Sequence, residues 1–112
     1  MNISAEQQDK VMVVSVAGSM DALTAPELTD FLSKQVATDN VNLVVDLAGL
    51  DYTSSAGLRA LLGAVKEARQ HGGDLRLAAV QPNVHKVLEI SGFTSILKVF
   101  PDVNAATSSY VA

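Results

Sequence analysis

The sequence predicts an α/β fold: one domain with a mostly parallel sheet of four or five strands, an N-terminal antiparallel hairpin and flanking helices. Apolar, β-branched runs alternate along the chain with segments whose apolar residues recur every three or four positions. This alternation is typical of parallel sheets with right-handed helical crossovers. The chain has 112 residues, enough for one domain and too few for two ordinary ones. We therefore expect a single domain over residues 1–112.

The first two elements are expected to form a hairpin. Residues 11–17 are a β-branched run that ends at Gly18, which is typical of a buried strand. Residues 2–8 are a weaker strand candidate, and Asp9 and Lys10 provide a turn between the two. The two strands would pair in antiparallel fashion.

The first helix is predicted from the spacing of its apolar residues. Between residues 28 and 36 they recur every three or four positions and so lie on one helical face. Asp21 or Thr24 can cap this helix, and Pro26 is tolerated in its first turn. The polar residues 38–40 end it.

The second half of the chain repeats the pattern of strand and helix. Residues 41–47 are almost continuously apolar, as in a central strand covered on both faces. After a polar segment, an apolar stripe from Leu58 to Ala68 predicts a helix that stops at Gly72 and Gly73, and we interpret this stripe as core. The remaining expected elements are a strand over residues 75–80, a short helix over 82–90, a strand over 96–100 and a helix over 103–112.

Composition excludes several classes of protein. The net charge is −4 and the basic residues are scattered, so we expect no nucleic-acid partner, which would need a basic face. The chain has no cysteine, which rules out disulfides and thiolate metal sites. No apolar run approaches the roughly 20 residues that span a bilayer, and the first residues lack a signal-peptide pattern. We therefore expect no membrane insertion and a cytoplasmic location.

The most informative segment lies between the central strand and the helix that follows it. Tyr52, Thr53, Ser54 and Ser55 offer four hydroxyls in a row, where one would suffice to cap a helix. This excess of hydroxyls predicts a functional site. Arg59, one turn into the helix, could pair with a phosphate or with a partner's carboxylate, or could simply face solvent.

Ser55 is the residue that we single out. If the helix begins at Ala56, Ser55 is its N-cap and its hydroxyl accepts a backbone N–H. A phosphate there would meet free N–H donors and the positive end of the helix dipole, so the fold would survive the modification. It would also add about two negative charges beside Asp21, Asp46 and Asp51. These properties predict a switch that acts on binding.

Catalysis by these serines is not expected. A nucleophilic Ser54 or Ser55 would lack the G-x-S-x-G pattern of a nucleophile elbow. The candidate bases are His71 and His85, and His71 lies roughly 24 Å away along the helix at 1.5 Å per residue. We therefore expect no catalytic residue.

A metal or cofactor site is also not expected. Asp21, Asp46 and Asp51 could gather at the carboxyl ends of the strands, but roles in turns and at strand ends explain them better. Gly57 and Gly63 lie within the helical pattern and do not form a phosphate loop, although the helix start could hold an anion weakly.

At these residues the sequence resembles the STAS family, the domain of sulfate transporters and of bacterial anti-sigma factor antagonists. The resemblance covers nearly the whole chain in the family's order. Ser55 aligns with the family's phosphoacceptor serine, and Ser54 stands where the family usually has an aspartate. The matching segments are Gly18-Ser19-Met20-Asp21, Val44-Val45-Asp46-Leu47-Ala48-Gly49-Leu50, Thr53-Ser54-Ser55-Ala56-Gly57-Leu58, Gly72-Gly73-Asp74-Leu75 and Val87-Leu88-Glu89-Ile90-Ser91-Gly92-Phe93.

The resemblance implies a STAS-like domain without catalysis of its own. It implies that the protein binds an anti-sigma factor that is also a serine kinase. Phosphorylation of Ser55, or less favourably of Ser54, would release this partner. A serine phosphatase would then remove the phosphate. We expect a monomer or a weak dimer. The alternatives are a STAS subunit of a transporter or signalling scaffold without a phosphorylation switch, and a domain that binds a nucleotide or small ligand. The residues expected to meet the partner are Asp21, Asp51, Thr53, Ser54, Ser55, Ala56, Gly57, Leu58 and Arg59.

Overall fold

The computed structural model describes residues 1–110, in which five strands form one sheet in the order β1-β2-β3-β4-β5. β1 and β2 are antiparallel, and each later pair of neighbours is parallel. The predicted fold class and the predicted hairpin are therefore confirmed. The strands are β1 (Asn2–Gln8), β2 (Val11–Met20), β3 (Asn42–Thr53), β4 (Asp74–Ala78) and β5 (Val99–Phe100). The helices are α1 (Ala25–Ala37), α2 (Ser55–Gln70), α3 (Pro82–Ile90), the 3-10 turn η1 (Phe93–Ser95) and α4 (Val103–Ser108).

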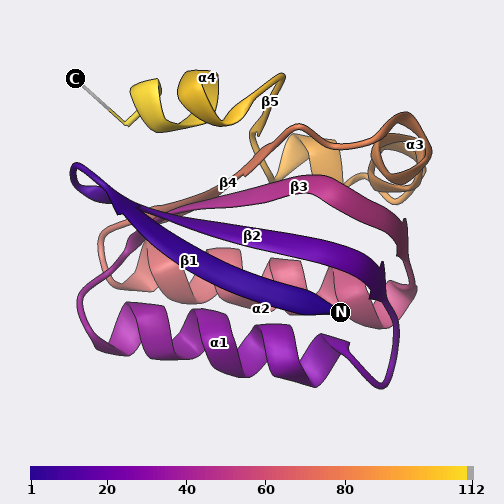
Figure 1. The fold of residues 1–112 in the computed structure, drawn as a ribbon, viewed down its shortest axis with the longest axis horizontal. Coiled ribbons are helices and arrows are strands. Elements are labelled where there is room, and N and C mark those ends of the chain that lie inside the picture. Colours follow the sequence, from indigo (N-terminus) through magenta and orange to yellow (C-terminus); the bar gives the residue numbers. More distant parts are fainter. Residues whose placement is uncertain (111–112) are drawn as a thin grey trace.

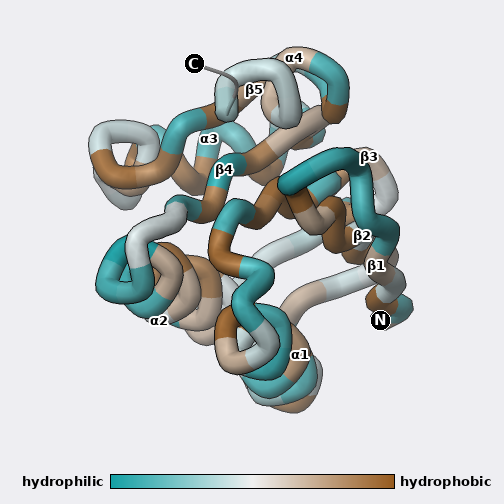
Figure 2. Tube along the Cα trace, turned by 90° about the vertical axis from the view of Figure 1, so that its left-hand side faces the viewer, coloured by the Kyte–Doolittle hydropathy of each residue, from teal (hydrophilic) through white to brown (hydrophobic). Residues whose placement is uncertain are grey.

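Helices cover both faces of the sheet. α1 and α2 lie on one face, and α3 and α4 lie on the other (Figure 1). The view turned by 90° separates the same three layers (Figure 2). Among residues 1–110, no helix is both long enough and apolar enough to cross a membrane.

The central strands each contain a continuous apolar stretch, residues 11–14 in β2 and 43–45 in β3, because both faces of the sheet are covered there. In β2, Val14 and Val16 join the larger core, to which α1 and α2 contribute, whereas Val11 and Val13 join a smaller cluster with α4. Val44 of β3 is fully buried in that smaller cluster. This arrangement accounts for the near-continuous apolar run that predicted a central strand.

β3 is longer than the sequence predicted. The run of apolar residues ends at Leu47, but β3 continues to Thr53, alongside a β2 that extends to Met20. Two register shifts keep this extension paired, and they set Gly49 opposite Ala17. A Cβ on Gly49 would lie 2.8 Å from the Cβ of Ala17, so the glycine permits the close pairing. Most of the polar segment between the apolar run and the next helix is therefore strand.

The last elements are shorter than predicted. β4 ends at Ala78 rather than at residue 80, because Ala79 has a positive φ of 55° that breaks the strand. The strand expected over residues 96–100 is reduced to β5, since the N–H of Ile96 donates to Phe93 O at 3.0 Å in the 3-10 turn. The last helix, expected over 103–112, ends at Ser108, and residues 111–112 lie outside the described part.

Asp74, at the start of β4, ties three elements together. Its carboxylate accepts hydrogen bonds from Arg69 Nε of α2 at 2.8 Å and from Arg76 Nε at 3.1 Å. Burial raises the pKa of this carboxyl, but the hydrogen bonds from Arg76 and Arg69 outweigh burial and hold the pKa below its ordinary value. Arg69 also donates to the carbonyl of Ile96 at 2.8 Å, which fixes the segment before β5.

Tyr110 attaches the C-terminal segment to the sheet. Its hydroxyl donates to the carbonyl oxygens of Leu43 at 2.7 Å and Asp74 at 2.9 Å. The guanidinium of Arg76 lies over its ring, 3.9 Å from the centroid, at a distance suited to a cation–π contact. Burial raises the pKa of the Tyr110 phenol, so the hydroxyl keeps its proton at neutral pH.

Removing this hydroxyl is expected to destabilise the fold. Tyr110→Phe removes both of these part-buried hydrogen bonds and should lower the free energy of unfolding by about 1–2 kcal/mol. Tyr52→Phe is the matched control, because Tyr52 is 52% exposed, and it should change the free energy by less than about 0.5 kcal/mol. Urea titration measures the free energy of unfolding of both variants. Equal losses in Tyr110→Phe and Tyr52→Phe would contradict the role given to Tyr110.

Candidate functional site

The junction between β3 and α2 shows which serine caps the helix. Ser54 is the N-cap: its backbone is extended, with φ −95° and ψ 175°, and its Oγ accepts the N–H of Gly57 at 3.4 Å. Ser55 is already the first helical residue. The prediction that Ser55 caps a helix starting at Ala56 is therefore wrong by one residue, because the chain leaves its extended conformation one position earlier.

Of the two adjacent serines, Ser55 is the one whose hydroxyl is free. Its side chain is exposed, and it makes no hydrogen bond within residues 1–110. Thr53, by contrast, is only 6% exposed and its Oγ1 donates to the carbonyl of Ser54 at 3.2 Å. Three neighbouring hydroxyls that look equivalent in the sequence thus differ in environment: that of Thr53 is buried, that of Ser54 caps the helix and that of Ser55 is open to solvent.

α2 approaches the end of β2 very closely. The N–H of Ser54 donates to the carbonyl of Met20 at 2.8 Å. A Cβ placed on Gly57 would lie 2.5 Å from Thr53 Oγ1 and 2.7 Å from Met20 Cγ, closer than real side chains allow. Glycine is therefore required where the first turn of α2 crosses this strand end.

The loop before α1 is held by Asp21. One oxygen of its carboxylate accepts the N–H groups of Thr24 at 3.0 Å and Leu23 at 2.9 Å. These backbone bonds from Thr24 and Leu23 lower the pKa of the Asp21 carboxyl. Thr24 occupies the N-cap position without a side-chain cap, and the N–H of Ala25 donates to the Asp21 carbonyl at 2.8 Å. The predicted side-chain cap from either residue is wrong, because both side chains are used inside the loop.

The other two carboxylates also have local partners. Asp46 accepts the N–H of Ala48 at 3.0 Å, and Asp51 accepts the hydroxyl of Ser19 at 3.3 Å. Within residues 1–110, no group of three or more potential metal ligands is clustered. The carboxylates considered for a metal site thus act in turns and strand pairing.

The two histidines are engaged elsewhere. His71 lies beyond the far end of α2, where its Nδ1 is 2.9 Å from the carbonyl oxygen of Glu67. His85 lies on α3, where its Nδ1 is 2.8 Å from a carboxylate oxygen of Glu89. Neither pairs with Ser54 or Ser55, so the structure assembles no serine–histidine pair among the described residues.

Two exposed apolar side chains belong to this region: Tyr52, one of the four hydroxyl-bearing residues that predicted the site, and Leu23, which the sequence did not single out by itself. Leu23 is 90% exposed on the loop that Asp21 holds, and Tyr52 is 52% exposed at the end of β3. A signal existed for Leu23, since it is a large apolar residue in a short loop of small and polar residues. Exposed tyrosines such as Tyr52 are enriched in surfaces that contact another protein.

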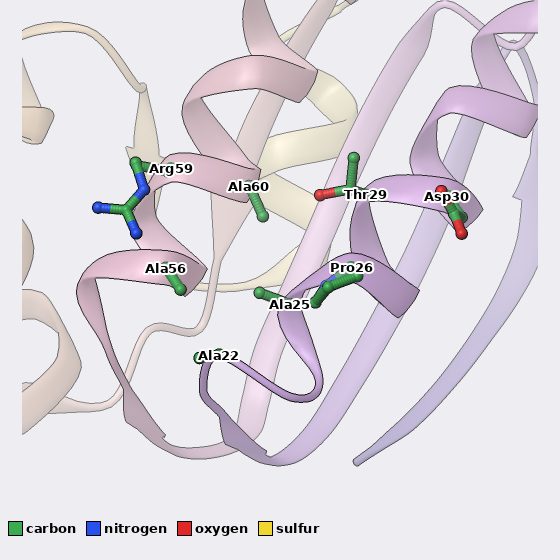
Figure 3. A pocket seen from close by; sticks show the side chains of 8 residues that line it. All are labelled: Ala22, Ala25, Pro26, Thr29, Asp30, Ala56, Arg59 and Ala60. Atoms are coloured by element: carbon green, nitrogen blue, oxygen red, sulfur yellow. The ribbon is translucent and has the colours of Figure 1, made fainter.

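A shallow cleft lies between α1 and α2, and Ala56, the residue after Ser55, lines it. Its volume is about 390 Å³. Arg59 and Asp30 lie on its opposite sides (Figure 3). Both of these side chains are exposed and do not pair with each other. The lining residues are Ala22, Ala25, Pro26, Thr29, Asp30, Ala56, Arg59 and Ala60.

Comparison with known proteins gives a consistent picture. The family model of the STAS domain matches residues 2–106. The chain is 36% identical to BtrV of Bordetella bronchiseptica, a candidate anti-sigma factor antagonist, over 98% of this chain and 95% of that protein. It is 31% identical to the anti-sigma-B factor antagonist of Listeria monocytogenes, over 88% of this chain and 90% of that protein.

A solved structure resembles the fold closely. The crystal structure of an anti-sigma factor antagonist from Mycobacterium paratuberculosis superposes with a TM-score of 0.88. The two chains are 27% identical, and the match covers 96% of this chain and 92% of the other.

The packing of α2 predicts opposite effects for two glycine substitutions in the same helix. Gly57→Ala should destabilise the protein by about 1–3 kcal/mol, because the new methyl group overlaps Met20 and Thr53. Gly63→Ala is the matched control, since a Cβ there meets nothing within 4 Å. It should stabilise by about 0.5–1 kcal/mol through helix propensity alone. Chemical denaturation measures the free energy of unfolding of both variants. If both substitutions stabilise the protein, the close approach of α2 to β2 is contradicted.

Proposed function

The chain belongs to the STAS domain family, and we propose that it is an anti-sigma factor antagonist that captures an anti-sigma factor with serine kinase activity. Two relatives that match nearly the whole chain and carry the name of anti-sigma factor antagonists support this proposal. The protein would contribute binding and no catalysis. The exchange of partners would take place in the cytoplasm.

One observation carries the proposal of a switch: Ser55 is exposed and has no hydrogen bond within the described residues, whereas Ser54 is occupied as the cap. A kinase can therefore reach the Ser55 hydroxyl without breaking the helix. Its Oγ would form a bond to the terminal phosphorus of ATP, the bond from that phosphorus to ADP would break, and a base of the kinase would take the hydroxyl proton. A serine phosphatase would reverse the modification by hydrolysis.

The fold would tolerate this phosphate. Ser55 lies in the first turn of α2, where backbone N–H groups and the positive end of the helix dipole favour a negative charge. The cap made by Ser54 would remain, because its oxygen already accepts from Gly57. Phosphorylation would therefore change the surface of the protein and leave its architecture intact.

The proposed partner surface has exposed and supporting parts. Leu23 and Tyr52 would add apolar contacts beside the residues expected from the sequence. Thr53, Gly57 and Leu58 are buried, so they would shape this surface from beneath. The exposed or half-exposed members are Asp21, Asp51, Ser54, Ser55, Ala56 and Arg59.

Partner binding by serine variants tests the proposal. The anti-sigma factor kinase from the same organism is titrated against the wild-type protein, Ser55→Ala and Ser55→Asp. Ser55→Ala should bind as the wild type does, and Ser55→Asp should bind at least about tenfold more weakly, because its carboxylate disturbs a desolvated contact.

Ser54→Ala is the matched control on the neighbouring hydroxyl. It should lose less affinity than Ser55→Asp, because it adds no charge, while it loses about 1 kcal/mol of stability through the lost cap. Equal affinity of all four proteins would contradict a switch at Ser55. Absence of any binding to the kinase would favour a subunit role in a transporter or scaffold.

A further inference from the structure

We propose that Arg59 is the residue through which phosphorylation of Ser55 alters the partner surface. The phosphate draws the Arg59 guanidinium into an ion pair along α2 and so withdraws it from the partner. This inference rests on the proposed modification of Ser55. It assigns a regulatory role to a side chain that makes no such contact in the unmodified protein.

The geometry of α2 sets the two side chains on the same face. Ser55 and Arg59 are four positions apart in one continuous helix, and residues at this spacing are neighbours on a helix surface. Both side chains are exposed, whereas Gly57, Leu58 and Ala60 between and beside them are buried. Ser55 and Arg59 therefore share the solvent-facing side of the first turns.

Arg59 is available for this role. In the described residues it forms no ion pair and no side-chain hydrogen bond, unlike Arg69 and Arg76, which are both bound to Asp74. It lies at the edge of the cleft, and Asp30 lies across the cleft on α1 (Figure 3). The guanidinium can therefore move without a loss of existing contacts.

The charges around the junction argue for a local mechanism. Among residues 18–24 and 51–60, Arg59 is the one basic side chain, against Asp21 and Asp51. A surface of this kind suits a basic partner, and a further negative charge would attract such a partner from a distance. Attraction of this kind would oppose release, so we assign release to the loss of a specific cation from the contact.

Phosphate and guanidinium are well matched for such a pair. Arginine binds phosphate with two parallel N–H donors in a planar fork. The anion stands N-terminal to the cation at a spacing of four, which is the favourable orientation in a helix. Phosphorylated Ser55 would therefore occupy Arg59, and a carboxylate of the partner would lose its cation.

The test uses the full chain with phosphoserine incorporated at position 55 during translation, so it needs neither the kinase nor the partner. The phosphate titration is followed by ³¹P NMR in the wild type, Arg59→Gln and Lys66→Gln. Lys66 is the matched control: it is exposed on the same helix and carries the same charge, but it lies eleven positions from Ser55.

The midpoint of the phosphate titration should rise by about 0.3 pH unit in Arg59→Gln, because the neighbouring cation stabilises the doubly charged phosphate. Lys66→Gln should match the wild type, and about 1 M salt should shrink the difference. Equal midpoints in the wild type and Arg59→Gln would show that phosphorylated Ser55 and Arg59 form no ion pair. Equal shifts in Arg59→Gln and Lys66→Gln would contradict the ion pair as well. A failure of the proposed function would appear only in the kinase-binding titration.

Discussion

The close approach of α2 to the end of β2 is the contact on which the rest of the site depends. Gly57 lies against Met20 and Thr53 with no room for a side chain, and the N–H of Ser54 donates to the carbonyl of Met20. This contact fixes where the strand ends and the helix begins. As a result Ser54 turns inward to cap the helix, and Ser55 emerges on the outer side of its first turn.

The polar groups around this contact act mainly as structural supports. Asp21 holds its loop through two backbone N–H groups, and Asp51 accepts from Ser19 across the paired strand ends. Because these carboxylates are engaged locally, they form a fixed negative surface. Within residues 1–110 the side chains of Ser55 and Arg59 have no hydrogen-bond or ion-pair partner, which suits a binding surface that a covalent modification can change.

The sequence predicted what depends on local pattern and could not predict what depends on distant contacts. The helix over Pro82–Ile90 was expected with its observed bounds, because its apolar spacing and its N-terminal proline are local signals. The extension of β3 was missed, since it exists only through pairing with β2 across two register shifts. The helix cap was predicted one residue too late. Either serine could cap the helix by its residue type, and only the contact of α2 with β2 determines which of the two does so. The attachment of Tyr110 to Leu43 spans 67 residues and leaves no local signal.

The central claim is that the fold leaves one of two adjacent serines open to modification. The most direct measurement is mass-spectrometric localisation of phosphate on the native protein after incubation with the proposed anti-sigma factor kinase and ATP. Fragment ions that separate Ser54 from Ser55 identify the modified serine. The expected result is phosphate on Ser55 with Ser54 unmodified. Phosphate on Ser54, or comparable amounts on both serines, would contradict the account.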